Sequence, residues 1–234
     1  MKVIAFASQK GGSGKTTLAA HLAVEAERVG DGPVALMDAD PQGSLTDWWN
    51  ERESEVPLFA QTSIARLSEH LEEMRAKGIK LLLIDTPPAI TSTIGHVVHV
   101  ADLVVIPMRP SPHDLRAAGG TVDIAERLDK PLVFVLNGAH PRARITTEAA
   151  ISLSQHGAVA DTVMHQRTDF AASMIDGRTV MEVSTRSRSP EEVKDLWTYV
   201  KGRLFGRTSH ARNVKGRKDS EGPSSLVAEA TGES

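Results

Sequence analysis

The stretch that most constrains this chain is Lys10–Thr17, which reads KGGSGKTT. It follows the apolar run Val3–Ala7 and opens the helix-length segment Lys15–Val29, which is the context of a phosphate-binding loop. Glycines let the backbone approach phosphates closely, and successive backbone N–H groups form an anion nest beside the positive end of the helix. The sequence therefore predicts a nucleoside phosphate site whose binding residues are Gly11, Gly12, Ser13, Gly14, Lys15, Thr16 and Thr17.

Two side chains of this loop have individual roles in the prediction. Lys15 is expected to reach the β- and γ-phosphates, and the Thr16 hydroxyl is expected to ligate Mg²⁺. The usual pattern has glycine at position 9, where this chain has Gln9, and Lys10 adds a second lysine to the loop. The loop thus departs from the common phosphate-binding motif at its first position and carries an additional lysine at the second.

Short aliphatic runs recur along the chain after Val3–Ala7, at Val34–Met37, Leu81–Ile84, Leu103–Ile106 and Leu132–Leu136. Continuous apolar runs, as opposed to alternating ones, are typical of strands buried on both faces of a parallel sheet. Helix-length segments separate these runs, at Lys15–Val29, Ser63–Lys77, Pro112–Leu128 and Thr146–His156. We therefore predict an α/β fold, a doubly wound and mostly parallel sheet with helices on both faces, as in P-loop NTPases.

Two of the predicted strands end in aspartate. Asp85 follows Leu81–Ile84 in the manner of a Walker B strand, whose aspartate holds Mg²⁺, usually through water. Asp38 and Asp40 follow the second run. An aspartate at a strand end often only caps the next helix, but ligands of doubly wound sheets collect at the carboxyl ends of the strands. Together with the phosphate loop, these residues predict a metal site at Thr16, Asp38 and Asp85.

Charge is distributed unevenly, although the formal net charge of the chain is only −3. Residues 1–177 have 16 basic and 22 acidic side chains. Residues 178–218 have 11 basic and 4 acidic side chains, and residues 219–234 have 4 acidic side chains and no basic ones. A basic block on a mildly acidic protein predicts a polyanionic partner. The alternative is a solvated surface that has no partner.

A helix is predicted to start with Ser189 as its N-cap and Pro190 at its first position. Apolar residues then recur at helical spacing and form one apolar face, namely Val193, Leu196, Trp197, Val200 and Leu204. After Phe205 the sequence is rich in Gly, Ser and charged residues. We therefore predict one folded domain over residues 1–205 and a disordered, basic-then-acidic tail over residues 206–234.

Composition excludes several classes of site. The chain has no cysteine, which rules out disulfides, thiolate zinc sites and cysteine nucleophiles. No apolar run approaches the roughly 20 residues that cross a bilayer. The first residues run too quickly into Gly and Lys to form a secretory signal, so we expect a cytoplasmic protein.

Lys10–Thr17 resembles the deviant Walker A motif of the ParA/MinD superfamily of P-loop ATPases, and Asp38–Gln42 resembles its Walker A′ motif. The resemblance covers about residues 1–205. Further segments are similar to the small ParF-type partition ATPases, namely Ser44–Trp48, Pro107–Pro112 with Asp114, Ala117–Gly119, Gln166-Arg167 and Met174–Gly177.

The resemblance implies that the chain binds ATP and Mg²⁺ and forms a nucleotide-sandwich homodimer. Lys10 matches the lysine that reaches across such a dimer to the partner's nucleotide. Asp40 matches the aspartate that positions or activates the attacking water, so Lys10, Lys15 and Asp40 are the implied catalytic residues. Asp85 matches the Walker B aspartate, and Asp38 is expected to support the metal through water.

For the adenine base, the resemblance implies the proline-rich element, with Pro107, Arg109 and Pro110. From its residues alone this element is equally a stiff loop after a strand. Asn137, at the end of the run Leu132–Leu136, is a further candidate for contact with adenine.

The resemblance also implies partners. ParA-like ATP dimers bind double-stranded nucleoid DNA without sequence preference, and a ParB-like or ParG-like cargo-bound protein stimulates hydrolysis and release. The expected location is therefore the nucleoid, and the cargo can be a plasmid, a chromosome or a protein cluster. The basic block supplies the candidate DNA contacts, which are Arg178, Arg186, Arg188, Lys194, Lys201 and Arg203.

Two alternatives to this interpretation stay open. Val200–Gly206 resembles the basic amphipathic membrane anchor of MinD, which makes membrane binding the rival of DNA binding. A kinase or synthetase that acts on a small molecule is a second P-loop alternative. The nitrogenase iron protein needs cysteines, and a GTPase needs an Asn-Lys-x-Asp motif, neither of which occurs here.

Overall fold

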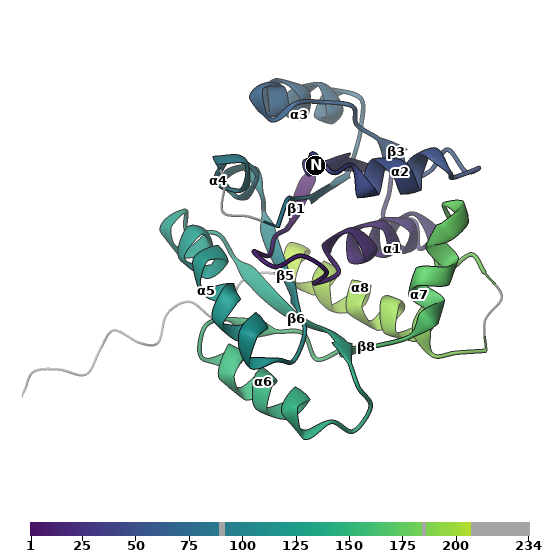
Figure 1. Ribbon diagram of the computed structural model, residues 1–234. Coiled ribbons are helices and arrows are strands. Elements are labelled where there is room, and N and C mark those ends of the chain that lie inside the picture. The colour runs from purple at the N-terminus through teal and green to yellow at the C-terminus, as the bar shows by residue number, and fades with distance from the viewer. Residues whose placement is uncertain (89–91, 184–185, 207–234) are drawn as a thin grey trace, which may run out of the picture.

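The computed structural model in Figure 1 describes residues 1–88, 92–183 and 186–206. An eight-stranded sheet runs in the order β3-β2-β4-β1-β5-β6-β7, with β8 paired to β6. Every strand pairing in these residues is parallel, as the aliphatic runs predict. The strands are β1 Lys2–Phe6, β2 Val34–Asp38, β3 Leu58–Phe59, β4 Leu81–Asp85, β5 Leu103–Met108, β6 Leu132–Ala139, β7 Ala158–Val159 and β8 Met164–His165.

Helices cover both faces of this sheet (Figure 1). The α-helices are α1 Lys15–Arg28, α2 Ser44–Asn50, α3 Leu67–Ala76, α4 Ser92–Val100, α5 Pro112–Arg127, α6 Arg144–Ser154, α7 Thr168–Ser173 and α8 Ser189–Phe205. Two short 3₁₀ turns, η1 Ile64–Arg66 and η2 Met174–Asp176, precede α3 and follow α7. The predicted doubly wound α/β fold is therefore confirmed.

Alternate residues of the central strand serve two separate cores. On β1, Ile4 and Phe6 pack with α1, α2 and α8, whereas Val3 and Ala5 pack with α3, α4, α5 and α6. All four side chains are completely buried. A strand with apolar neighbours on both faces needs a continuous apolar sequence, and this explains the uninterrupted runs.

The last helix packs with its apolar face against α1. Trp197, Val200 and Leu204 belong to that core, and the indole N–H of Trp197 donates to Asp31 Oδ2 at 2.9 Å. The helix begins at Ser189 itself, with Arg188 in the cap position, one residue earlier than predicted. Within the described residues, no helix combines the length and the apolar character that crossing a membrane requires.

Parallel pairing brings the ends of three strands to one edge of the sheet. Asp38 at the end of β2 is the register partner of Asp85 at the end of β4, and Asp85 is the register partner of Phe6 on β1. The phosphate loop follows β1 directly. Residues from three separate parts of the chain therefore meet at the carboxyl edge of the sheet.

Candidate nucleotide-binding site

The loop between β1 and α1 needs glycine where the backbone is left-handed. Gly12 has φ of +70° and Gly14, the cap residue of α1, has φ of +99°. A Cβ on Gly14 would lie 2.1 Å from the Asn137 amide nitrogen, which donates to the Ser13 carbonyl at 2.7 Å. Asn137 on β6 thus braces the phosphate loop from outside the motif.

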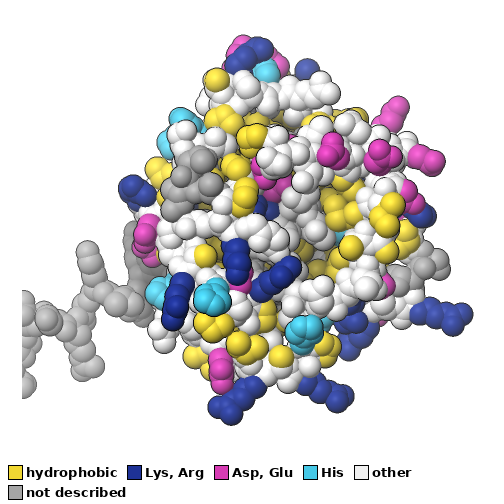
Figure 2. All heavy atoms as spheres, in the orientation of Figure 1, with side chains coloured by type: hydrophobic (Ala, Val, Ile, Leu, Met, Phe, Trp, Pro, Cys, Tyr) yellow, Lys and Arg dark blue, Asp and Glu magenta, His cyan; other side chains and the backbone are white. Residues whose placement is uncertain are grey.

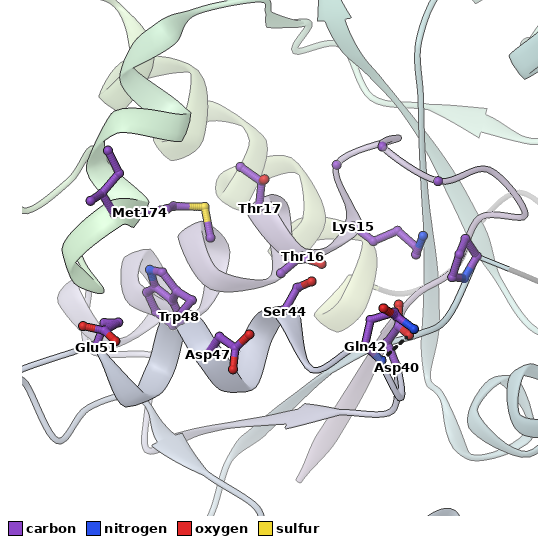
Figure 3. Close-up of a pocket in the computed structure, with 15 residues that line it drawn as sticks. Lys15, Thr16, Thr17, Asp40, Gln42, Ser44, Asp47, Trp48, Glu51 and Met174 are labelled. Atoms are coloured by element: carbon purple, nitrogen blue, oxygen red, sulfur yellow. Dashed lines mark hydrogen bonds between the residues drawn. The ribbon is translucent and has the colours of Figure 1, made fainter.

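Lys15 lies in the wall of a cavity of about 670 Å³ together with glycines of the loop, and its side chain crosses this cavity (Figure 3). The residue is only 7% exposed. Burial holds the pKa of Lys15 below its usual value, although the charges of Asp85 and Asp40 act in the opposite direction. A buried ammonium group that faces two carboxylates is placed to bind and neutralise an incoming phosphate.

The Thr16 hydroxyl donates to Asp85 Oδ2 at 2.5 Å. The other oxygen of Asp85 is buried and, among the described residues, has no hydrogen-bond partner. Burial raises the pKa of Asp85 to about 7, with the Thr16 hydrogen bond opposing this change and the charge of Asp38 adding to it. Mg²⁺ fits this pair, because a cation would satisfy the buried oxygen and favour the ionised carboxylate.

Asp38 anchors the start of α2. One carboxylate oxygen accepts hydrogen bonds from the backbone N–H groups of Leu45 and Thr46 and from the Thr46 hydroxyl, at 2.9 to 3.1 Å. The other accepts from the backbone N–H of Asp40 at 2.9 Å. Asp38 therefore caps the next helix, which is the alternative that the sequence analysis named for an aspartate at a strand end, and it also holds the loop that carries Asp40. Its support of the metal stays a prediction.

Asp40 lies in the wall of the same cavity as the phosphate loop. Its Oδ1 accepts from the backbone N–H of Gln42 at 3.0 Å, and Figure 3 shows both side chains near the end of Lys15. The structure thus brings together the P-loop lysine and the carboxylate expected to position water, although they lie on different loops.

Lys10 turns away from that cavity and toward α5. Its ammonium group forms an ion pair with Asp114 Oδ2 at 2.9 Å, and the Asp114 side chain is only 3% exposed. The Ser111 hydroxyl, which caps α5, also contacts this carboxylate. With its amide oxygen turned toward α5, Gln9 accepts from the backbone N–H groups of Gly120 and Thr121, each at 3.1 Å. The two unusual residues of the loop thus tie it to α5.

A smaller cavity of about 230 Å³ adjoins the loop at Gly12, Gly14 and Thr17. Of the residues predicted to contact adenine, Arg109 and Asn137 line it, whereas Pro107 is a buried residue of β5 and Pro110 lies in the following loop. Sequence reasoning gave no role to several of its other lining residues, including Gly138, His165, Gln166 and Phe170. Gly138 lies on β6 and His165 on β8, whereas Gln166 follows β8 and Phe170 lies on α7. Of these four, only Gln166 belongs to a segment that the sequence analysis singled out.

The residues predicted to contact DNA lie at several places in the fold, and some of them form ion pairs within the protein. On α8, Lys194 and Lys201 lie two turns apart on one flank of the apolar face, and Arg203 lies on the opposite flank. Lys201 pairs with Asp31 at 2.6 Å, as Arg178 does with Asp176. The remaining candidates, Arg186 and Arg188, are exposed just before α8, where Arg188 lies 3.5 Å from Glu191.

The sequence model of the CobQ/CobB/MinD/ParA nucleotide binding domain matches residues 4–180. This chain belongs to that family. The matched range includes the phosphate loop, both acidic strand ends and both cavities. As a member of the ParA/MinD group of this family the chain is an ATPase, and the resemblance stated from its motifs is confirmed.

The similarity to named relatives covers most of this chain. It is 30% identical over 216 residues to the Maintenance of carboxysome distribution protein A of Halothiobacillus neapolitanus, with 84% of this chain and 95% of the relative covered. It is 30% identical over 188 residues to Protein ParA of Rhizobium radiobacter, covering 74% and 82%. The crystal structure of a plasmid partition protein from Borrelia burgdorferi bound to AMPPNP has the same fold, with a TM-score of 0.66, 17% identity and 86% and 99% of the two chains covered.

Proposed function

We propose that this ATPase positions cargo along DNA. ATP and Mg²⁺ close a nucleotide-sandwich homodimer, the dimer binds double-stranded DNA of the nucleoid without sequence preference, and a cargo-bound ParB-like or ParG-like protein stimulates hydrolysis and release. Relatives named for carboxysome distribution and as ParA support a positioning role. Plasmid, chromosome and protein-cluster cargo all agree with this mechanism.

One observation carries the proposal, namely that the phosphate loop and Asp40 line the same cavity. A cavity that only binds nucleotide needs the loop, whereas hydrolysis also needs a group that orients water toward the γ-phosphate. Asp40 is held for that task by backbone hydrogen bonds through Asp38 and Gln42. This arrangement supports hydrolysis with a positioned carboxylate.

The chain's own residues divide the chemistry. Backbone N–H groups of the loop bind the phosphate oxygens, and the Lys15 ammonium group offsets charge that develops between the β- and γ-phosphates. Thr16 and Asp85 would hold Mg²⁺, which when bound neutralises phosphate charge. Asp40 orients the attacking water. Lys10 leaves Asp114 and adds a positive charge to the nucleotide of the other protomer.

The packing of α8 favours DNA over the membrane alternative. An amphipathic anchor must present its apolar face to lipid, but Trp197, Val200 and Leu204 are at most 7% exposed. Phe205 is the one large apolar side chain of α8 that is substantially exposed, at 54%. Acidic side chains gather around α2 (Figure 2), where Asp47, Glu51, Glu53 and Glu55 are exposed, so we expect DNA on another face.

Co-sedimentation with nonspecific DNA and flotation with anionic liposomes, each with ATP and with ADP, test this proposal. We expect binding to DNA with ATP only, with an affinity that falls steeply as salt rises. Lys194→Gln should weaken DNA binding, whereas the control Lys77→Gln, an exposed lysine outside the basic block, should not. Binding to liposomes with no binding to DNA would overturn the proposal.

A further inference from the structure

The segment Gly177–Glu182 follows η2 and is tied to both helices that border the larger cavity. Just before it, Met174 and Ile175 of η2 line that cavity opposite the phosphate loop, together with Trp48 of α2 (Figure 3). This segment has no part in the proposed chemistry so far, yet it forms hydrogen bonds both with α1 and with the residues at the end of α2.

The first set of contacts joins the segment to the end of α2. Arg52 donates to the Gly177 carbonyl at 2.8 Å and forms a two-pronged ion pair with Glu182 at 2.5 and 2.9 Å. The Arg52 side chain is only 3% exposed, and it lies 5.3 Å from the centre of the Trp48 ring. Glu182 also accepts from the backbone N–H and the hydroxyl of Thr179.

Two further details show how closely the segment fits against α2. The Trp48 indole N–H donates to the Arg178 carbonyl at 3.0 Å. Gly177 has φ of +71°, and a Cβ there would lie 2.4 Å from the backbone nitrogen and Cα of Arg52. Only glycine allows the two backbones to approach this closely.

The second set of contacts joins the segment to α1 through His21, which is completely buried. His21 Nδ1 lies 2.7 Å from the carbonyl oxygen of Thr17, the last residue of the phosphate loop. His21 Nε2 accepts from the backbone N–H of Val180 at 3.2 Å. A neutral imidazole that is protonated on Nδ1 satisfies both bonds, so one side chain connects the first turn of α1, where the phosphate loop ends, to the segment.

These contacts form a continuous mechanical connection. It runs from Thr17 through His21 to the segment, from there through Arg52 and Trp48 to α2, and from α2 through Asp38 to Asp40. The phosphate loop and the loop that carries Asp40 lie in separate parts of the sequence. These contacts hold the two loops at a fixed distance from each other. A small displacement of a group that orients a reactant costs far more in rate than in substrate binding.

We propose that Gly177–Glu182 is a positioning strap that sets the distance between the phosphate loop and Asp40, and that the Arg52–Glu182 pair is the contact that fastens it to α2. The strap contributes to hydrolysis and leaves nucleotide affinity unchanged. This inference rests on the role of Asp40 in the proposed function. It does not depend on DNA or on a partner protein.

Glu182→Gln tests the strap, because glutamine keeps the shape of the side chain and removes its charge. The control is Glu148→Gln, which removes an equivalent carboxylate from the exposed ion pair with Arg144 on α6. Turnover at saturating ATP, the dissociation constant of a nonhydrolysable ATP analogue and the melting temperature are measured on the full chain without DNA. Trp48→Phe, which removes the indole N–H and replaces the bicyclic ring with a smaller one, and Asp40→Ala are measured in parallel.

We expect Glu182→Gln to lower kcat about fivefold, with nucleotide affinity within about twofold of wild type. For Trp48→Phe we expect a decrease in kcat about half as large, again with nucleotide affinity little changed. Unchanged turnover in Glu182→Gln, with Asp40→Ala impaired, would overturn the strap and leave the proposed function intact. Normal turnover in Asp40→Ala would instead overturn the role of Asp40. A fall in kcat that is matched by equal losses of affinity and melting temperature would show a general structural role and also overturn the strap.

Discussion

The two walls of the nucleotide cavity were built in different ways. One wall is the phosphate loop Lys10–Thr17, eight consecutive residues that follow β1 and include the start of α1. The other wall consists of α2 and η2, and the strap connects them. The ion pair that fastens the strap joins Arg52 and Glu182, which are 130 positions apart in the chain. From this difference we infer that the phosphate loop is encoded locally, whereas the placement of Asp40, the proposed hydrolytic residue, depends on contacts that form only in the folded protein.

Removing Lys15 should have the largest effect, because it acts on the local wall. Lys15→Ala is expected to lower ATP turnover roughly 1,000-fold and to weaken nucleotide binding, since the cavity loses the ammonium group that faces the phosphates. A phosphate-release assay and analogue titration measure both quantities. Lys77→Ala, which changes an exposed lysine directly after α3 and outside the lining of the cavity, is the control. Normal turnover in Lys15→Ala would refute the assignment of the site.

Asp40→Ala should separate the two walls. Turnover is expected to fall roughly 100-fold, because the water loses its orienting carboxylate, while the protein still binds ATP and still dimerises. Single-turnover kinetics and light scattering with ATP check the two parts. Asp47→Ala, an exposed carboxylate that borders the same cavity from α2, is the matched control. If Asp40→Ala lowers ATP affinity as much as it lowers turnover, the two walls do not have separate roles in binding and hydrolysis.

Because His21 connects α1 to the strap, its protonation at low pH should lower the free energy of unfolding. Burial lowers the pKa of His21 to about 4 in the folded protein, from an ordinary value of 6.5. The unfolded chain therefore binds more protons between these values, and the stability that His21 contributes is lost as pH falls from 6.5 toward 4. Asp85 acts in the opposite direction, because burial raises its pKa to about 7.

The effect of His21 is therefore measured in an Asp85→Asn background. There the free energy of unfolding should drop by about 2 kcal/mol between pH 7 and pH 5 as a consequence of His21. Urea unfolding at both pH values, compared with the same background that also carries His21→Gln, gives this difference. The same drop in both proteins would show that other groups are responsible.

The smallest effect is expected at the contact between Lys10 and α5. Asp114→Asn releases Lys10 from its ion pair and should lower the ATP concentration needed for dimerisation about threefold, because a pair with one exposed partner contributes at most ~1 kcal/mol. Asp123→Asn, an exposed residue of the same helix, is the control. If dimerisation needs more ATP in Asp114→Asn, the ion pair assists the dimer and does not hold Lys10 back.

The sheet and the first wall could be predicted because their signals are local. Uninterrupted aliphatic runs located the five long strands, and the loop motif located Lys15 and Thr16. The short strands and α2 have too few residues for a periodic pattern. The contact between Lys10 and Asp114 and the contacts of the strap with α1 and Arg52 arise only from tertiary packing.

The basic block illustrates the same limit. Its charge is plain from the sequence, and Arg178 pairs locally with Asp176, but the pairing of Lys201 with Asp31 depends on which segments meet. Trp197 and Val200 likewise suit an anchor or a core helix in sequence, and only packing on α1 decides between them. Composition therefore predicts a polyanionic partner, whereas which of the basic residues are already paired within the protein depends on packing.

The nucleotide-driven switch is tested most directly by following DNA association in one sample while ATP is consumed. The account predicts that wild-type protein binds DNA with ATP and dissociates as ATP runs out, whereas Asp40→Ala stays bound over the same period. Wild-type protein that remains on DNA after all ATP has become ADP would contradict the account.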